Sequence, residues 1–192
     1  IIFFDTHDDN IIQKKKKIKY FIMLMFNKKK KDLRNIYYKI VEESKVSYYL
    51  FNDGIGGTDH FREVFQLNLI LILWYMKTKN LSEKYLEYLI KIFIKDLEGM
   101  VIELGGSETS LRKKIRKFIE NFYGRLYAFS EIFDNFDNGG KKQLKDVINK
   151  NLKSPQVTKL IINYLSLNYN HLKQLDEKDF WKANIFTNKK SI

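Results

Sequence analysis

A cluster of five cations stands at the start of one predicted helix, and its residue types and spacing suit the binding of an anion. Ser110 is the predicted N-cap and Leu111 opens the apolar stripe; the cations that follow are Arg112, Lys113, Lys114, Arg116 and Lys117. A helix N-terminus carries about half a positive charge and favours acids by roughly 0.3–1 kcal/mol per charge. These cations therefore oppose the dipole and each other, and a negatively charged partner would relieve that opposition. The alternative is a solvated charged face.

The same helix continues into Phe122-Tyr123-Gly124-Arg125. A glycine inside a helix costs about 1 kcal/mol relative to alanine, so Gly124 indicates that another backbone approaches closely. Tyr123 and Arg125 fall beside the apolar stripe, and both residue types are common interface anchors. We therefore predict six partner-binding residues: Lys113, Lys114, Lys117, Tyr123, Gly124 and Arg125. The alternative for Arg125 is an internal pair with a carboxylate that locks the helix.

Three acids, Asp96, Glu98 and Glu103, precede this helix. Helical residues two apart point in different directions, so Asp96 and Glu98 are not a natural catalytic pair. We predict that all three are structural acids, which bridge to the basic helix across a hairpin closed by Gly105 and Gly106.

No arrangement of residues predicts catalysis. The three histidines, His7, His60 and His171, are far apart and fit no metal-ligand motif. The absence of cysteine excludes thiol catalysis, disulfides and cysteine-ligated metals. We predict a protein that is not an enzyme and that uses no cofactor or metal.

The elements that position these residues are all helical. Apolar residues recur at three- and four-residue steps, and no strand pattern is present. We predict an all-α fold, a single compact domain of about six helices with a central hairpin formed by residues of about 82–104 and 110–133. Ser154-Pro155 marks the start of the last long helix. The most apolar run, Val64 to Met76, is too short to span a membrane and predicts a buried core helix.

The chain divides into one domain with two ends. Residues 1–30 form a basic extension that is either non-native or flexible, residues 31–186 form the helical domain, and residues 187–192 are a tail. The net charge is +12, from 35 Lys+Arg against 23 Asp+Glu. This balance favours anionic partners such as RNA, a ribosome surface or anionic lipid.

Several stretches stand in the order and spacing of one known family. Residues 96–98 and 103–105 resemble its D-M-D-x-x-L-R-E-L-G run, although Ile102 replaces the arginine. Residues 110–114 and 122–125 match its S-x-x-K-K and F-Y-G-R motifs, and residues 144–152 are similar to L-x-x-A-L-x-R-N-V. Over roughly residues 33–180 the chain resembles the ubiquinol–cytochrome c chaperone family.

The resemblance implies a function. It suggests a non-enzymatic assembly chaperone that binds newly made cytochrome b and assists biogenesis of ubiquinol–cytochrome c reductase. The implied partners are cytochrome b, the ribosome and an anionic membrane surface, but not DNA; the need for a small partner subunit stays open. The implied location is the cytoplasm beside the inner membrane for a bacterial-type member, or the mitochondrial matrix side for a eukaryotic one. The rival hypothesis is a general basic RNA-binding or ribosome-binding helical module.

Overall fold

The computed structural model describes residues 27–46, 58–103, 105 and 107–187, and every regular element within them is helical. Residues 27–46 form a helix, which is followed by α2 (Thr58–Thr78), α3 (Glu83–Glu103), α4 (Glu108–Asp134), the short 3-10 turn η1 (Phe136–Asn138), α5 (Gly140–Leu152), α6 (Pro155–Gln174) and α7 (Glu177–Phe180). This confirms the predicted all-α, single-domain fold. Residues 1–26 and 188–192, which make up most of the predicted extension and tail, lie outside the described residues, whereas residues 27–30 belong to the first helix.

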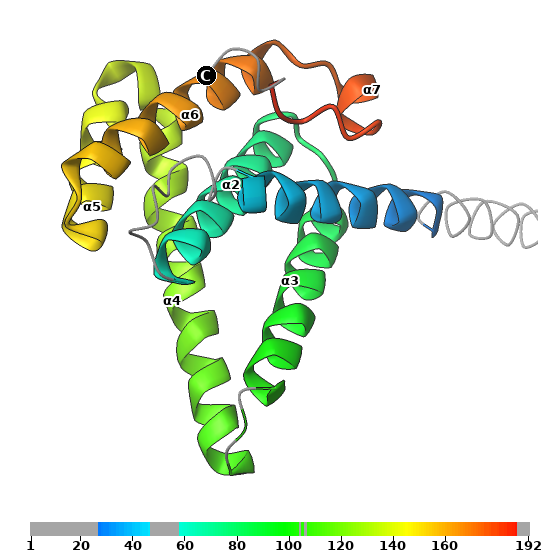
Figure 1. Cartoon of the computed structure of the whole chain (residues 1–192). Coiled ribbons are helices and arrows are strands. Elements are labelled where there is room, and N and C mark those ends of the chain that lie inside the picture. Colours follow the sequence, from blue (N-terminus) through cyan, green and yellow to red (C-terminus); the bar gives the residue numbers. More distant parts are fainter. Residues whose placement is uncertain (1–26, 47–57, 104, 106, 188–192) are drawn as a thin grey trace, which may run out of the picture.

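Helix α2 is the centre of the fold. It packs against α3, α4 and α6, and the 27–46 helix crosses it in Figure 1. Every residue from Glu63 to Met76 is buried, so this helix is surrounded on all sides. The prediction that the apolar run forms a buried core helix is confirmed. Within the described ranges, no helix is long and apolar enough to cross a membrane.

One buried amide ties three helices together at the middle of this core. Asn68 of α2 donates from Nδ2 to Oγ of Ser44 at 3.0 Å, and its Oδ1 accepts from Tyr164 Oη of α6 at 3.0 Å. Ser44 in turn donates to the carbonyl of Ile40 at 2.6 Å. The amide therefore has a partner on each side, which removes the cost of burying it.

The predicted hairpin is present as α3 and α4, and the two helices converge at the bottom of Figure 1, away from α2. The predicted N-cap of α4 is wrong by one turn, because Ser107 caps the helix in place of Ser110. Ser107 has the extended backbone of a cap (φ −68°, ψ 146°), and its Oγ accepts from the amide of Ser110 at 3.4 Å. The earlier start places Glu108 in the first turn, where an acid is favourable.

Two glycines make the corner between α4 and α5. Gly139 has a φ of 103°, and a Cβ at Gly140 would overlap the carbonyl oxygen of Ile132 and lie 2.8 Å from the carbonyl carbon of Asn135. Only glycine fits this close approach. At the next junction Ser154 caps α6 ahead of Pro155, with Oγ accepting from the amide of Val157 at 3.5 Å, so the predicted start is confirmed.

The end of the described chain folds back onto α2. The ring of Phe180 is fully buried with its centroid 4.9 Å from that of Tyr75. Tyr75 Oη donates to the carbonyl of Leu175 at 3.1 Å. Near the start of the first described helix, Nζ of Lys29 lies 3.5 Å from the ring centroid of Trp181. The segment after α6 thus covers one end of the core.

Candidate partner-binding site

The cations at the start of α4 are partly neutralised along the helix itself. Arg112 pairs with Glu108 at 2.6 Å and Arg116 with Glu120 at 2.8 Å, both at the i,i+4 spacing. All four side chains are mostly exposed, so each pair contributes only about 0.3–0.5 kcal/mol. The remaining three cations are exposed and form no ion pair with any described residue: Lys113, Lys114 and Lys117. We call these three lysines the basic tip.

The three structural acids do not bridge to α4, so that part of the prediction is wrong. Asp96 makes a side-chain hydrogen bond with Tyr37 of the 27–46 helix. Glu98 and Glu103 are exposed and have no ion-pair partner in the described part of the chain. Burial, together with the charge and hydrogen bond of Asp96, holds the pKa of Tyr37 well above its usual range. Asp96 therefore ties α3 to the first helix instead of to α4.

Arg125 turns inward and finds its carboxylate on α2. Its Nη1 donates to Oε2 of Glu63 at 2.8 Å and its Nη2 to Oε1 at 2.6 Å, which is a bidentate pair. The side chains are 24% and 7% exposed, and the guanidinium carbon lies 4.9 Å from the ring centroid of Phe129. This is the internal pair that the sequence left as the alternative for Arg125. The Nε of Arg125 is buried and has no hydrogen-bond partner.

Gly124 and Tyr123 lie on the solvent side of the same turn. A Cβ added at Gly124 would meet no atom of this chain within 4 Å, so no other part of the described chain approaches it closely, and the approach of a partner's backbone stays a prediction. Gly124 lines a groove of about 600 Å³ that also reaches Val147 of α5. Tyr123 is half exposed, and one turn further along Tyr127 is more exposed still. Helical spacing places Lys113, Lys117 and Gly124 along one face of α4.

The apolar stripe of α4 meets different surroundings at its two ends. Phe122, Phe129, Ile132 and Phe133 are buried, but the stripe residues before Phe122 are only partly buried: Leu111, Ile115, Phe118 and Ile119. The facing end of α3 is better covered, because Leu97 and Val101 are buried there after Phe93. We call residues 94–103 and 108–119 the arm.

An apolar groove runs along the arm where it meets α2. It has a volume of about 620 Å³ and is lined by Phe61, Arg62, Phe65, Gln66, Phe93, Leu97, Met100, Val101, Glu103 and Phe118. Apolar side chains supply most of this lining, and Arg62 and Glu103 add one charge of each sign. Met100 on its edge is 51% exposed. We call this feature the arm groove; its chemistry suits an apolar segment of a partner.

Sequence reasoning missed two parts of this region. Glu63 was not identified as the partner of Arg125, although an acid beside a continuous apolar run already indicates a buried carboxylate that needs a cation. The arm groove was not located either, since it forms between residues up to 57 positions apart on α2, α3 and α4, from Phe61 to Phe118. In the residues that the structure describes, no group of His, Asp or Glu side chains could hold a metal ion.

Comparisons with known proteins agree with this architecture. The fold is similar to the crystal structure of the Cbp3 homolog from Brucella abortus, with a TM-score of 0.64 and 20% sequence identity over 87% of this chain and 97% of that one. No curated protein matches the sequence significantly. Residues 61–187 match the family described as ubiquinol-cytochrome C chaperone, which is well over half of the chain. The match includes α4, the arm groove and helices α5, α6 and α7. The chain therefore belongs to the ubiquinol–cytochrome c chaperone family.

Proposed function

We propose that this chaperone acts without catalysis by binding newly made cytochrome b during assembly of ubiquinol–cytochrome c reductase. Membership of the family supports the coarser role in assembly. The observation that carries the finer proposal is the arm groove, an apolar trough on a helical arm whose stripe is only partly buried.

The arm groove fits a helix better than it fits a small polar substrate. Amphipathic or apolar helices dock in grooves by inserting side chains at successive turns. The floor of the groove offers Phe61, Phe65 and Phe93, whose rings already contact one another at centroid distances of 6.1 and 5.8 Å. A membrane protein before assembly exposes apolar helices of this kind, and cytochrome b is the client that the family suggests.

Met100 gives the groove a deformable edge. Methionine is unbranched and polarisable, and it is common on surfaces that accept several apolar shapes. Its half-exposed position on α3 lets it close over a bound segment. The basic tip stands at the far end of the same arm, where we assign Lys113, Lys114 and Lys117 to contact with the phosphate groups of the ribosome that makes the client.

A pair of matched variants tests the groove. Met100→Lys places a charge on the groove edge, whereas Ile102→Lys places the same charge two residues away at a side chain that is 61% exposed and does not line the groove. Each tagged protein is purified from detergent-solubilised membranes of the native host, and cytochrome b is measured in the eluate. We expect Met100→Lys to lose cytochrome b and Ile102→Lys to retain it.

Two results would contradict the proposal. Equal recovery of cytochrome b with both variants would show that the groove does not hold the client. Absence of cytochrome b from the wild-type eluate would show that it is not the client. Thermal unfolding of both variants checks that neither change has disturbed the fold.

A further inference from the structure

A second basic surface lies on α5 and α6, away from the arm. Residues 139–159 contain six lysines and one acid, Asp146. The lysines are Lys141, Lys142, Lys145, Lys150, Lys153 and Lys159. None of them forms an ion pair with a described residue, and all are exposed. The chain has no arginine after Arg125, so lysine alone supplies the positive charge of this surface.

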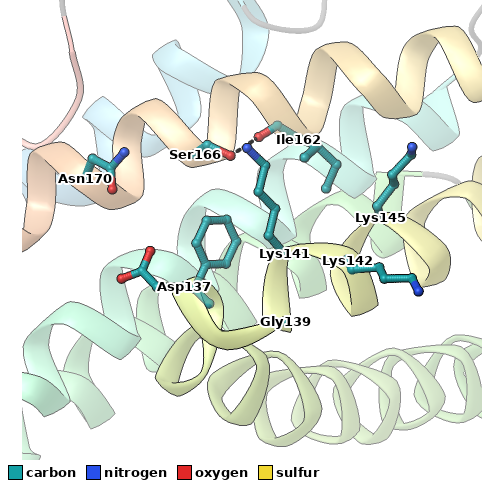
Figure 2. Close-up of a pocket in the computed structure, with 9 residues that line it drawn as sticks. Asp137, Gly139, Lys141, Lys142, Lys145, Ile162, Ser166 and Asn170 are labelled. Atoms are coloured by element: carbon teal, nitrogen blue, oxygen red, sulfur yellow. Dashed lines mark hydrogen bonds between the residues drawn. The ribbon is translucent and has the colours of Figure 1, made fainter.

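Helix geometry places three of these lysines beside α6. Leu144 and Ile148 bury the inner face of α5, which leaves Lys141, Lys142 and Lys145 on the side and outer faces. They line a groove of about 550 Å³ together with Ser166 and Asn170 of α6. Figure 2 shows Lys141 and Lys145 rising from α5 toward α6.

The one carboxylate that lines this groove, Asp137, is paired with a lysine of α6 and not with the lysines of α5. Asp137 accepts a hydrogen bond from Nζ of Lys173 at 2.7 Å, and it also interacts with Tyr169. The three α5 lysines therefore keep their full charge toward solvent. On α6, Lys159 lies three residues before Ile162 of the groove wall, so it extends the same face. Its neighbour Leu160 is 40% exposed.

The chemistry of this face favours lipid headgroups over RNA. Arginine forks and exposed aromatic rings are the usual means of gripping phosphates and stacking bases, and the described part of this face has neither. Phe136 lines the groove but is buried, with its ring centroid 4.4 Å from that of Tyr169. Clustered lysines without these features suit diffuse attraction to anionic headgroups.

We propose that the face formed by Lys141, Lys142, Lys145 and Lys159 docks the protein on an anionic phospholipid surface. It does so independently of the arm groove and of which client the groove holds. In Figure 1, α5 and α6 lie at the opposite end of α4 from the hairpin tip. Docking through α5 and α6 therefore leaves the arm clear of the membrane-contacting face.

The test is vesicle flotation of the full chain. The vesicles are made of phosphatidylcholine alone or of equal parts phosphatidylcholine and phosphatidylglycerol. The variant Lys141→Glu/Lys142→Glu/Lys145→Glu is compared with Lys113→Glu/Lys114→Glu/Lys117→Glu, which makes the same change in net charge at the basic tip. Each lysine near an anionic surface adds roughly fivefold to binding, so loss of three weakens binding about a hundredfold. Because glutamate also repels the surface, we expect the α5 variant to bind mixed vesicles at least that much more weakly. The tip variant should stay within about threefold of wild type.

Three results would overturn the proposal. They are no binding of the wild-type chain to mixed vesicles, an equal loss in the two variants, and an α5 variant that still binds like wild type. A parallel titration with polyuridylate tests whether the lysine face binds RNA phosphates instead of lipid headgroups. If the α5 variant loses RNA binding but keeps vesicle binding, this face is an RNA-binding surface. Unfolding midpoints of both variants confirm that each is folded. Recovery of cytochrome b from detergent extracts reports on the arm groove separately, so the two proposals fail independently.

Discussion

The two ends of α4 carry one continuous apolar pattern, yet the stripe is buried to different extents at the two ends. From Phe122 onward the stripe is mostly buried against α2 and its neighbours, with Leu126 partly so, whereas from Leu111 to Ile119 it is only partly covered. The sequence repeat is the same in both halves, so periodicity alone does not tell whether a stripe faces a core or a partner. In this protein the half with a core supplies stability, and the half without one supplies the proposed binding surface.

Truncating one aromatic residue in each half gives the largest contrast. Phe122 is fully buried with its ring centroid 4.6 Å from that of Phe93, so Phe122→Ala should lower the free energy of unfolding by about 4 kcal/mol. Phe118→Ala, in the arm, should cost less than about 2 kcal/mol because its side chain is already partly solvated. Urea denaturation measures both. Similar losses would mean that the arm is as well packed as the core.

Breaking the ion pair that joins α4 to α2 should have the next largest effect. Arg125→Met leaves Glu63 buried without its cation, and we expect a loss of about 3 kcal/mol in the free energy of unfolding. Adding Glu63→Gln removes the stranded charge, so the double variant should lose less than the sum of the two single variants. Additive losses in urea denaturation would show that the pair is not coupled.

High pH should weaken the core around Tyr75, whereas the arm itself contains no tyrosine and meets one through the Asp96–Tyr37 hydrogen bond. Burial, with smaller contributions from Glu177 and Asp176, raises the pKa of Tyr75 to about 12. Because the folded protein favours the neutral phenol, this stability is complete below the unfolded pKa of about 10 and is lost as pH rises through about 12. We expect a loss of roughly 2 kcal/mol over that window. Tyr75→Phe should flatten this part of the stability profile, and an unchanged slope would contradict the assignment.

The smallest predicted change in the free energy of unfolding is an increase. Gly124 has open space where a Cβ would stand, so Gly124→Ala should raise the free energy of unfolding by up to about 1 kcal/mol through helix propensity. Thermal unfolding provides the measurement, and a decrease would mean that the site is more crowded than the structure shows. If the stabilised variant also recovers less cytochrome b, Gly124 is part of a partner interface, as the sequence predicted.

The sequence predicted the local features of this fold well. Helical spacing predicted the hairpin, and Ser154-Pro155 predicted the start of α6, because these signals lie within a few residues of their effect. The N-cap of α4 was misplaced because Ser107 and Ser110 offer the same capping chemistry, so the local sequence does not distinguish them. Arg125 was uncertain for a different reason: its partner Glu63 is 62 positions away, and only tertiary packing brings the two together.

The buried amide of Asn68 has a consequence for how the two regions can move. If α6 slid past α2 by one turn, about 5.4 Å, the amide would lose its bond from Tyr164, and an unpaired buried group costs about 1–3 kcal/mol. The hydrogen bonds of Asn68 thus favour one alignment of the core helices. The described part of the arm buries no polar side chain, so nothing comparable fixes how its two helices slide. The arm can therefore adjust its shape to an incoming segment while α2 and α6 of the core keep their alignment.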